Sequence, residues 1–482
     1  MITYEGESFV KKKLLIKDGR TKGIIKIPEE LISGYYYLKV YTRWKRNYSP
    51  QTFSYTPVKI INYKSNEFVN SPKSNYISDF KIDSSTVKYE DKLLSVDKET
   101  VNRGDEITVT INKIPENTSV AVIRVLPYAV YNNNILKIVS QENKNYFNFK
   151  YLPETRGVSL SGIIVGKKNK QPIANNQVNL SIIDTINYSF TTITDSAGKF
   201  YFDLGNIYKN KELLITVKEK GNPLEILVDN DFCNRQIKLP FIPFTINNNE
   251  RDFYTEFINR GIVENSYIVI DSQKIQTEEN YINLNYQKPD FKLILSDYIS
   301  MSHLADYFHE LIPNVGIRRK NNQSVFQVFG NISELQIYSP LVLIDNVIIT
   351  NIDKLLQISP NNIYSIETFE KPYAIGNQLF GGVIRINSKD DDLAKIELPE
   401  SGMFLNYKML SANAVINYKR TTNKHIPLSG NTVFWDVISK ENLTDKQKTT
   451  FTTSNIPGKY IIEVRMLKNY DYIVDTLSYI VK

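Results

Sequence analysis

Short runs of β-branched and aromatic residues recur throughout this chain, separated by clusters of Gly, Pro, Asn and Asp. The runs follow one another at roughly 8–12 residues, a spacing that is typical of antiparallel β domains. Within several runs apolar and polar residues alternate, as around Tyr460, Ile462 and Val464, and this period of two predicts half-buried strands. A chain of 482 residues is long enough for roughly three domains of ordinary size. We therefore predict a mainly β, multidomain protein that contains tandem β-sandwiches.

Composition and charge argue against several classes of protein. Cys233 is the only cysteine, so no intramolecular disulfide can form. No apolar run reaches the roughly 18 residues of a membrane-spanning helix, so the sequence predicts no transmembrane segment of its own. The net charge of +7 comes from scattered residues with short basic runs at Lys11–Lys13 and Arg318–Lys320, and we expect no nucleic-acid binding. Because Met1–Val10 lacks the basic and apolar regions of a signal peptide, we expect the export signal to be missing from this chain.

The segment Ser339–Lys389 combines several motifs in a fixed order. An apolar run ends in an Asp-Asn turn, a second strand follows Ser-Pro-Asn-Asn, and an aromatic–Gly turn precedes a Gly-Gly-Val-Ile strand; the pieces are Pro340–Asn346, Ser359–Thr368, Tyr373–Gly376 and Gly381–Lys389. This combination resembles the plug domain of TonB-dependent outer-membrane receptors. The resemblance implies a small α/β domain at 296–389. The barrel that follows a plug in such receptors needs at least ~220 residues, so we expect no barrel in residues 390–482.

An amphipathic pattern marks the start of this plug-like domain. Leu304, Phe308 and Leu311 form an apolar stripe, which predicts a helix within Leu295–Pro313. Ser300 or Ser302 is placed to cap it, and Pro313 ends it.

A second set of motifs lies at 157–232. Gly157–Val165, Gln171–Ile183 and Thr191–Leu204 read as strands, and Asp195–Gly198 is a hairpin turn in which Gly198 is free to take a positive φ. The order and spacing resemble the carboxypeptidase-regulatory-like, transthyretin-type β-sandwich, which is not a peptidase. Alternation predicts that Val178, Leu180 and Ile182 face one side, and Asn179, Ser181 and Ile183 the other.

Three further segments resemble macroglobulin-like (MG) domains, namely Ile27–Tyr55, Val101–Ile111 and Asn431–Leu467. For Ile27–Tyr55 an unrelated sandwich strand with a buried Trp44 stays open as an alternative. The resemblances divide the chain into MG-like domains at 1–64, 80–152 and 400–482, the transthyretin-like sandwich at 157–232, a connector at 233–295 and the plug-like domain at 296–389. Within the connector we expect one or two helical turns at Tyr254–Arg260 and strands at Tyr267–Ile270 and Tyr281–Leu284.

Residues able to do chemistry are few. His303, Asp306 and Glu310 could share one helix face, which is compatible with a metal, although an exposed polar face is the simpler interpretation. His425 lies in a loop without an evident partner. The carboxylate groups Asp229/Asp231 and Asp390–Asp392 could bind calcium but lack EF-hand spacing. No motif of a hydrolase, nucleotide-binding protein or metalloprotease occurs, so we predict no enzymatic activity, no catalytic residues, no metal and no cofactor.

The plug resemblance suggests an interaction site at two turns of that domain. The candidate residues are Asp345, Asn346, Tyr373, Gly376, Leu379, Phe380, Gly381 and Gly382. The glycines permit tight turns, and the aromatic and aliphatic side chains could contact a partner. The alternative is that the aromatic residues cover the domain's own core.

The combined resemblances imply a non-enzymatic binding or assembly protein of the cell envelope, either periplasmic or associated with the outer membrane. Its expected partner is another outer-membrane or periplasmic protein. The alternative is a piece of a TonB-dependent transporter for nutrient uptake.

Overall fold

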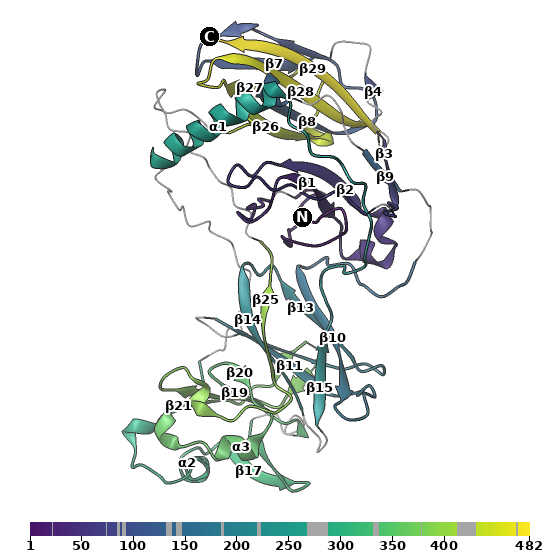
Figure 1. Ribbon diagram of the computed structural model, residues 1–482. Helices are drawn as coiled ribbons and strands as arrows, with labels where there is room; N and C mark the ends of the chain where they lie inside the picture. Colours follow the sequence, from purple (N-terminus) through teal and green to yellow (C-terminus); the bar gives the residue numbers. More distant parts are fainter. Residues whose placement is uncertain are drawn as a thin grey trace.

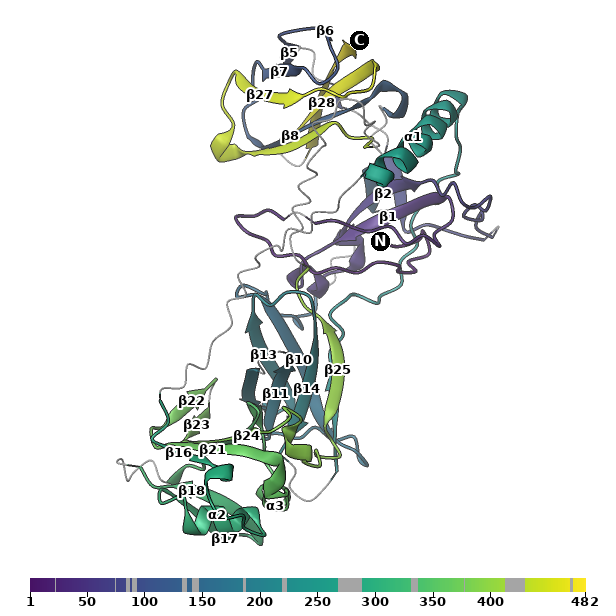
Figure 2. The ribbon, with the colours of Figure 1, turned by 90° about the vertical axis from the view of Figure 1, so that its left-hand side faces the viewer.

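The computed structural model describes residues 1–21, 23–73, 75–83, 87–88, 93–131, 137–140, 147–184, 188–218, 223–267, 288–330, 337–376, 378–411, 430–468 and 471–482. The protein is mainly β, as predicted, and its strands form several separate sheets. Figures 1 and 2 show four bodies arranged in a column. We call them, from one end to the other, the terminal sandwich, the N-terminal unit, the central sandwich and the α/β unit.

The terminal sandwich consists of two sheets around one apolar core. Its strands are β4 (Val87–Lys88), β5 (Leu94–Val96), β6 (Thr100–Val101), β7 (Glu106–Ile111), β8 (Thr118–Pro127), β26 (Phe434–Ser439), β27 (Gln447–Thr452), β28 (Gly458–Lys468) and β29 (Asp471–Val481). One sheet has the order β26-β8-β28-β29-β4, with β6 also paired to β29, and the other has the order β27-β7-β5. Ile107, Ile123 and Val464 are fully buried between the sheets.

This sandwich unites two segments that the sequence suggested were separate modules, 80–152 and 400–482. β8 lies between β26 and β28, and β7 pairs with β27. Neither segment has enough described strands to cover both sides of the core, so their strands alternate in the same sheets.

The N-terminal unit has little regular structure. β1 (Gly34–Val40) pairs with β2 (Ser54–Ile60), and β3 (Phe80–Asp83) pairs with β9 (Lys137–Ser140). Its core is mostly aromatic and includes Tyr4, Tyr37, Phe53, Tyr55 and Phe80, together with Ile237 and Leu239 from the connector. Phe9–Lys17 has only isolated bridges, at Lys13 and Lys17, and no strand forms in Gly23–Ile27.

The central sandwich contains the described strands of the segment 157–232. One sheet has the order β13-β10-β15 and the other β12-β11-β14-β25. The strands are β10 (Val158–Gly166), β11 (Gln177–Ile183), β12 (Tyr188–Ile193), β13 (Lys199–Gly205), β14 (Asn210–Val217), β15 (Leu224–Val228) and β25 (Met403–Lys408). Gly198 has φ +73°, which agrees with the predicted turn. The last strand, β25, comes from beyond the α/β unit, so the sandwich is not completed by 157–232 alone.

The two faces of β11 are both buried. Val178, Leu180 and Ile182 lie in the sandwich core, as the alternation predicted. Asn179 and Ser181 on the opposite face are only 1% and 2% exposed, because the α/β unit covers them.

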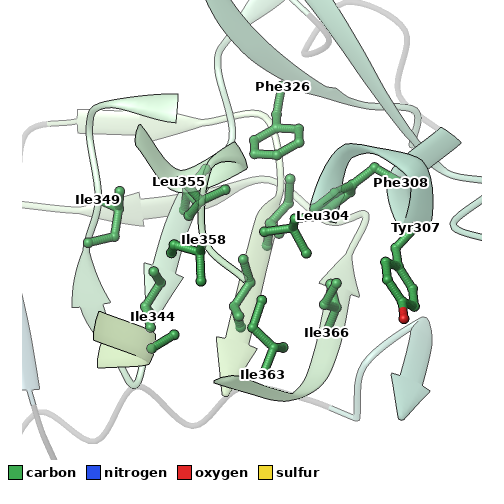
Figure 3. Close-up of a cluster of buried hydrophobic side chains, with 14 of the residues drawn as sticks. Leu304, Tyr307, Phe308, Phe326, Ile344, Ile349, Leu355, Ile358, Ile363 and Ile366 are labelled. Atoms are coloured by element: carbon green, nitrogen blue, oxygen red, sulfur yellow. The ribbon is translucent and has the colours of Figure 1, made fainter. Parts of the chain in front are cut away.

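The α/β unit spans β16 to β24. Its elements are β16 (Phe291–Ile294), α2 (Leu304–Glu310), β17 (Val315–Lys320), β18 (Gln323–Val328), β19 (Leu341–Ile344), β20 (Val347–Ile348), α3 (Ile352–Leu356), β21 (Ile363–Phe369), β22 (Tyr373–Ile375), β23 (Gln378–Phe380) and β24 (Val383–Ser388). The main sheet has the order β16-β21-β24-β19-β20, with β19 parallel to β24. Figure 3 shows its core, in which Leu304, Phe308 and Leu355 from the helices meet Ile344, Ile363 and Ile366 from the sheet.

The helix predicted within Leu295–Pro313 is shorter than that range. A 3₁₀ turn at Leu295–Asp297 comes first, and α2 begins only after His303. The Asp306 carboxylate accepts a hydrogen bond from the backbone N–H of His303 (3.2 Å), so neither Ser300 nor Ser302 is the cap.

The connector forms more helix than the sequence suggested. α1 (Asn248–Tyr267) has 20 residues and contacts the turn Tyr128–Val130 of the terminal sandwich, while Lys59 of the N-terminal unit pairs with Glu250 (2.9 Å). Figure 1 shows α1 beside these two bodies. The expected strand Tyr281–Leu284 and most of Tyr267–Ile270 lie outside the described residues. In the part of the chain that the structure describes, no helix has the length and apolar character needed to span a membrane.

Candidate interaction site

The two predicted turns both lie against β12, the edge strand of the central sandwich. β12 contacts β20, β22 and β23, and β11 also contacts β20. The structure therefore brings the two turns to the same neighbour. That neighbour belongs to this chain.

The Asp345-Asn346 turn is fixed from both sides. Both residues have positive φ, 46° and 63°. The buried Asp345 carboxylate accepts hydrogen bonds from Ser388 N (2.7 Å), Ser388 Oγ (2.6 Å) and Leu393 N (2.9 Å). Asn346 O accepts a hydrogen bond from Ser189 Oγ of β12 (2.6 Å). Asp345 therefore stabilises the α/β unit itself, and Asn346 connects that unit to the central sandwich.

The aromatic–Gly turn is the tip of the hairpin β22–β23. Phe380 is buried in a small apolar cluster with Leu343 and Phe369, and the half-buried Tyr373 packs against that cluster. Burial raises the pKa of Tyr373. Leu379 is 41% exposed. The large apolar side chains Tyr373, Ile375 and Phe380 therefore belong to the domain's own core, and Leu379 does not.

The glycines of this region permit close approach of backbone. Gly376 has φ +58°, and a Cβ there would lie 2.8 Å from Thr191 O of the central sandwich. Gly382 has φ +139°, and a Cβ there would lie 2.8 Å from Phe369 O. Gly381 N donates to Ser339 O (3.2 Å). The first glycine therefore serves the contact between units, and the other two serve the fold of the α/β unit.

A second joint, which sequence reasoning did not find, connects the N-terminal unit with the opposite end of the central sandwich. We call it the charged joint; its members are Lys13, Arg43, Arg46, Glu154, Ser161, Asp229, Asp231 and Tyr407. Lys13 Nζ lies 2.6 Å from Asp231 Oδ2, and Arg43 Nη1 lies 3.5 Å from Asp231 Oδ1 and 3.2 Å from Glu154 Oε1. The side chains of Lys13, Arg43 and Asp231 are only 14%, 7% and 12% exposed.

The segment Tyr41–Asn47, which lies within the motif at Ile27–Tyr55, supplies half of this joint. Arg43 Nη2 donates to Ser161 Oγ of β10 (2.8 Å), and Ser161 Oγ donates to Asp229 (2.8 Å). Arg46 donates to the carbonyl oxygens of Asn230 and Asp231 (2.7 and 2.8 Å). The motif at Ile27–Tyr55 was the one sequence feature that drew attention to Arg43 and Arg46. Its spacing does not predict that they contact Asp229–Asp231, nearly two hundred positions later.

Tyr407 of β25 closes the charged joint from the other side. Its hydroxyl donates to Ser159 O (3.1 Å), and Lys13 Nζ lies 4.0 Å from its ring centroid. Burial raises the pKa of Tyr407, and the charge of Asp231 adds to this shift. Burial lowers the pKa of Lys13, while Asp231 opposes that shift.

The residues considered for metal binding are placed differently. Asp229 and Asp231 are engaged by Ser161, Lys13 and Arg43 rather than gathered around an open position. His303 precedes α2, and Asp390–Asp392 follow β24. Among the described residues no group of three or more His, Cys, Asp or Glu could hold a metal ion. His425 lies outside the described residues.

A group of four aromatic rings, two half-buried and two exposed, lies beside the charged joint. We call it the aromatic surface cluster, and it consists of Trp44, Tyr48, Phe147 and Phe149. Ring centroids are 5.1 Å apart for Tyr48–Phe147, 5.7 Å for Trp44–Phe149 and 6.2 Å for Trp44–Phe147. Phe147 is 52% exposed and Phe149 64% exposed.

Comparison of the chain with protein-family models gave no match, and comparison with curated proteins gave none.

Proposed function

We propose that this chain is a non-enzymatic binding or assembly protein of the cell envelope, at the outer membrane or in the periplasm, and that it acts by contacting another protein. The family resemblances of the sequence support the compartment. The observation that carries the binding role is the aromatic surface cluster.

Large aromatic side chains are enriched at the energetic centres of protein interfaces, because each ring offers a large contact area at a small cost in side-chain entropy. Two of the four rings, Phe147 and Phe149, are largely exposed to water, and adjoining exposed aromatic side chains of this kind favour a surface that a partner covers. Lys45 and Lys150 are exposed at its border. An apolar centre with a charged border is the arrangement expected of a protein-binding surface.

The cluster is also held in place before any partner arrives. Its rings come from two segments, which the fully buried Asn47 joins. The Asn47 side chain donates to Tyr151 O (2.8 Å) and accepts from Lys150 N and Tyr151 N (2.9 and 2.8 Å). Asn148 N donates to Asn47 O (2.9 Å). Such ordering lowers the entropy that binding would otherwise cost.

The test is a capture experiment with the purified chain as bait and a detergent-solubilised envelope fraction of the source cells. The variant is Phe147→Ser/Phe149→Ser. The matched control is Ile77→Ser/Ile299→Ser, which removes two apolar side chains that are 75% and 88% exposed elsewhere. Circular dichroism and Tm establish that both variants fold.

We expect wild type and the control to retain the same envelope protein, and the cluster variant to lose it by about tenfold or more, since several buried aromatic contacts are worth more than about 1.4 kcal/mol. Equal recovery by all three baits, or absence of the native protein from the envelope fraction, would contradict the proposal.

A further inference from the structure

Three segments from distant parts of the chain line a hollow of about 400 Å³ that is open to solvent, where the N-terminal unit meets the central sandwich. The segments are residues 11–13, 209–210 and 408–411. Their backbones are joined by hydrogen bonds from Ser411 N to Lys13 O (2.7 Å), from Lys209 N to Leu410 O (2.9 Å) and from Met409 N to Lys209 O (3.1 Å). Backbone hydrogen bonds therefore fix the three segments that form the walls of the hollow relative to one another.

Positive charge dominates the lining of this hollow. Five lysines line it, namely Lys11, Lys12, Lys13, Lys209 and Lys408, and among the described residues no carboxylate does. Because these lysines come from three segments, the sequence shows only the first run, Lys11–Lys13, which taken alone reads as an ordinary solvated surface.

The lysines differ in what they already contact. The Lys13 ammonium forms an ion pair with Asp231 (2.6 Å), and Lys11 Nζ lies 5.7 Å from the ring centroid of Phe232. Lys12, Lys209 and Lys408 are exposed, and none of them forms an ion pair with a carboxylate among the described residues. Lys209 is held at φ +68°, a conformation uncommon for residues with a side chain, by the two hydrogen bonds to the 409–410 backbone.

We propose that this hollow binds a phosphate-bearing ligand that carries more than one negative charge. Like charges held close together repel one another, and an anion placed among them removes that repulsion. Lysine ammonium groups act as point charges that suit the several oxygens of a phosphate group. The volume lies in the range of small-molecule sites, so a diphosphate or a phosphorylated headgroup can enter.

The same chemistry could come from two sources. One is a soluble anion such as pyrophosphate, and the other is a membrane lipid whose phosphate groups reach the hollow. The lining of the hollow includes no residue of the aromatic surface cluster, so anion binding and protein binding can be tested separately.

The experiment uses the full chain and measures two arms. Calorimetric titration with inorganic pyrophosphate at about 0.05 M and about 0.5 M NaCl tests the soluble source and its screening by salt. Co-sedimentation with phosphatidylcholine vesicles, with and without phosphatidic acid, tests the membrane source. The variant is Lys12→Gln/Lys209→Gln/Lys408→Gln. The control, Lys98→Gln/Lys113→Gln/Lys168→Gln, removes the same charge from exposed lysines elsewhere.

We expect wild type and the control to bind in at least one arm, and the hollow variant to lose affinity at least about tenfold. Binding to pyrophosphate supports a soluble ligand, and binding only to vesicles that contain phosphatidic acid supports a lipid ligand. The proposal is overturned if wild type binds in neither arm, or if the control loses as much affinity as the hollow variant. Tm values of the two variants within a few degrees of wild type ensure that the comparison concerns binding.

Discussion

The central sandwich meets its two neighbours through different chemistry. Toward the N-terminal unit the contact is made by buried charges, with Arg43 and Lys13 on one side and Asp231 on the other. Toward the α/β unit it is made by neutral groups, in which Ser189 Oγ donates to Asn346 O and shares a hydrogen bond of 2.8 Å with Ser181 Oγ.

The two contacts should differ in how much stability a single substitution removes. Removing one member of a buried ion pair leaves its partner charged and desolvated, which costs several kcal/mol. Removing one neutral hydrogen bond costs about 1 kcal/mol. The charged joint should therefore be sensitive to single substitutions and the neutral joint should weaken in small steps.

The largest effect is expected for Asp231→Asn. Lys13 and Arg43 would lose the carboxylate that they share while staying buried, so the free energy of unfolding should fall by about 3 kcal/mol. Urea unfolding followed by tryptophan fluorescence measures this as a lower midpoint of the first transition. Glu400→Gln, which removes one partner of the exposed Lys167–Glu400 pair, should leave the midpoint unchanged. Equal midpoints for both variants would show that the charged joint adds nothing to stability.

The second effect concerns the neutral joint. Gly376→Ala should cost about 2 kcal/mol, since the new Cβ combines a strained φ with a 2.8 Å approach to Thr191 O. Gly19→Ala is the matched control, because Gly19 also has positive φ but nothing lies within 4 Å of the position that a Cβ would take there, and it should cost about 1 kcal/mol. The difference between the two, measured by urea unfolding, isolates the contact between units. If the two substitutions lower the free energy of unfolding equally, the β22–β23 hairpin does not pack tightly against the central sandwich.

Ser189→Ala should have a smaller effect. It removes the donor to Asn346 O and the partner of Ser181 Oγ, and we expect a loss of about 1 kcal/mol. Ser95→Ala, whose hydroxyl bonds Asn112 at the surface (2.9 Å), should cost less than about 0.5 kcal/mol. A loss of about 3 kcal/mol for Ser189→Ala would show that the neutral joint is as sensitive to a single substitution as the charged joint.

The smallest effect is expected at alkaline pH. The pKa of Tyr407 is raised in the folded protein, so its contribution is present below about pH 10 and is lost as the pH rises. Above that value the unfolded chain releases the proton and the folded protein keeps it, which favours unfolding by about 0.8 kcal/mol at about pH 10.5. Tyr407→Phe should remove this part of the pH dependence. Parallel unfolding profiles of wild type and Tyr407→Phe between about pH 9 and 11 would be inconsistent with a buried, neutral Tyr407.

Local pattern was enough to predict most strands and the left-handed turn at Gly198, because alternation and turn residues act over a few positions. It did not predict that Asn179 and Ser181 are buried, since polar residues on an outer face ordinarily contact water. Their burial depends on a unit that begins about a hundred residues later. The same limit applies to β8, whose neighbours β26 and β28 follow some 300 residues further along the chain.

The candidate interaction residues show the limit at the level of a site. The turns at Asp345-Asn346 and Tyr373–Phe380 were predicted as turns from their residue types, and the structure has turns there. Residue types do not reveal which surface a turn meets, and here both meet β12. The charged joint was missed for a related reason, since no local rule pairs Arg43 with Asp231.

The shared terminal sandwich has a consequence during synthesis. β8 emerges from the ribosome about 300 residues before β26, the first of its two neighbours in the sheet. At about 5–20 residues per second, the apolar face that carries Ile123 and Val125 waits roughly 15–60 s for its partner strands. An unpaired apolar strand aggregates readily over such a period. The apolar face of β8 therefore stays without its two neighbours in the sheet until the segment that carries β26 and β28 has been made.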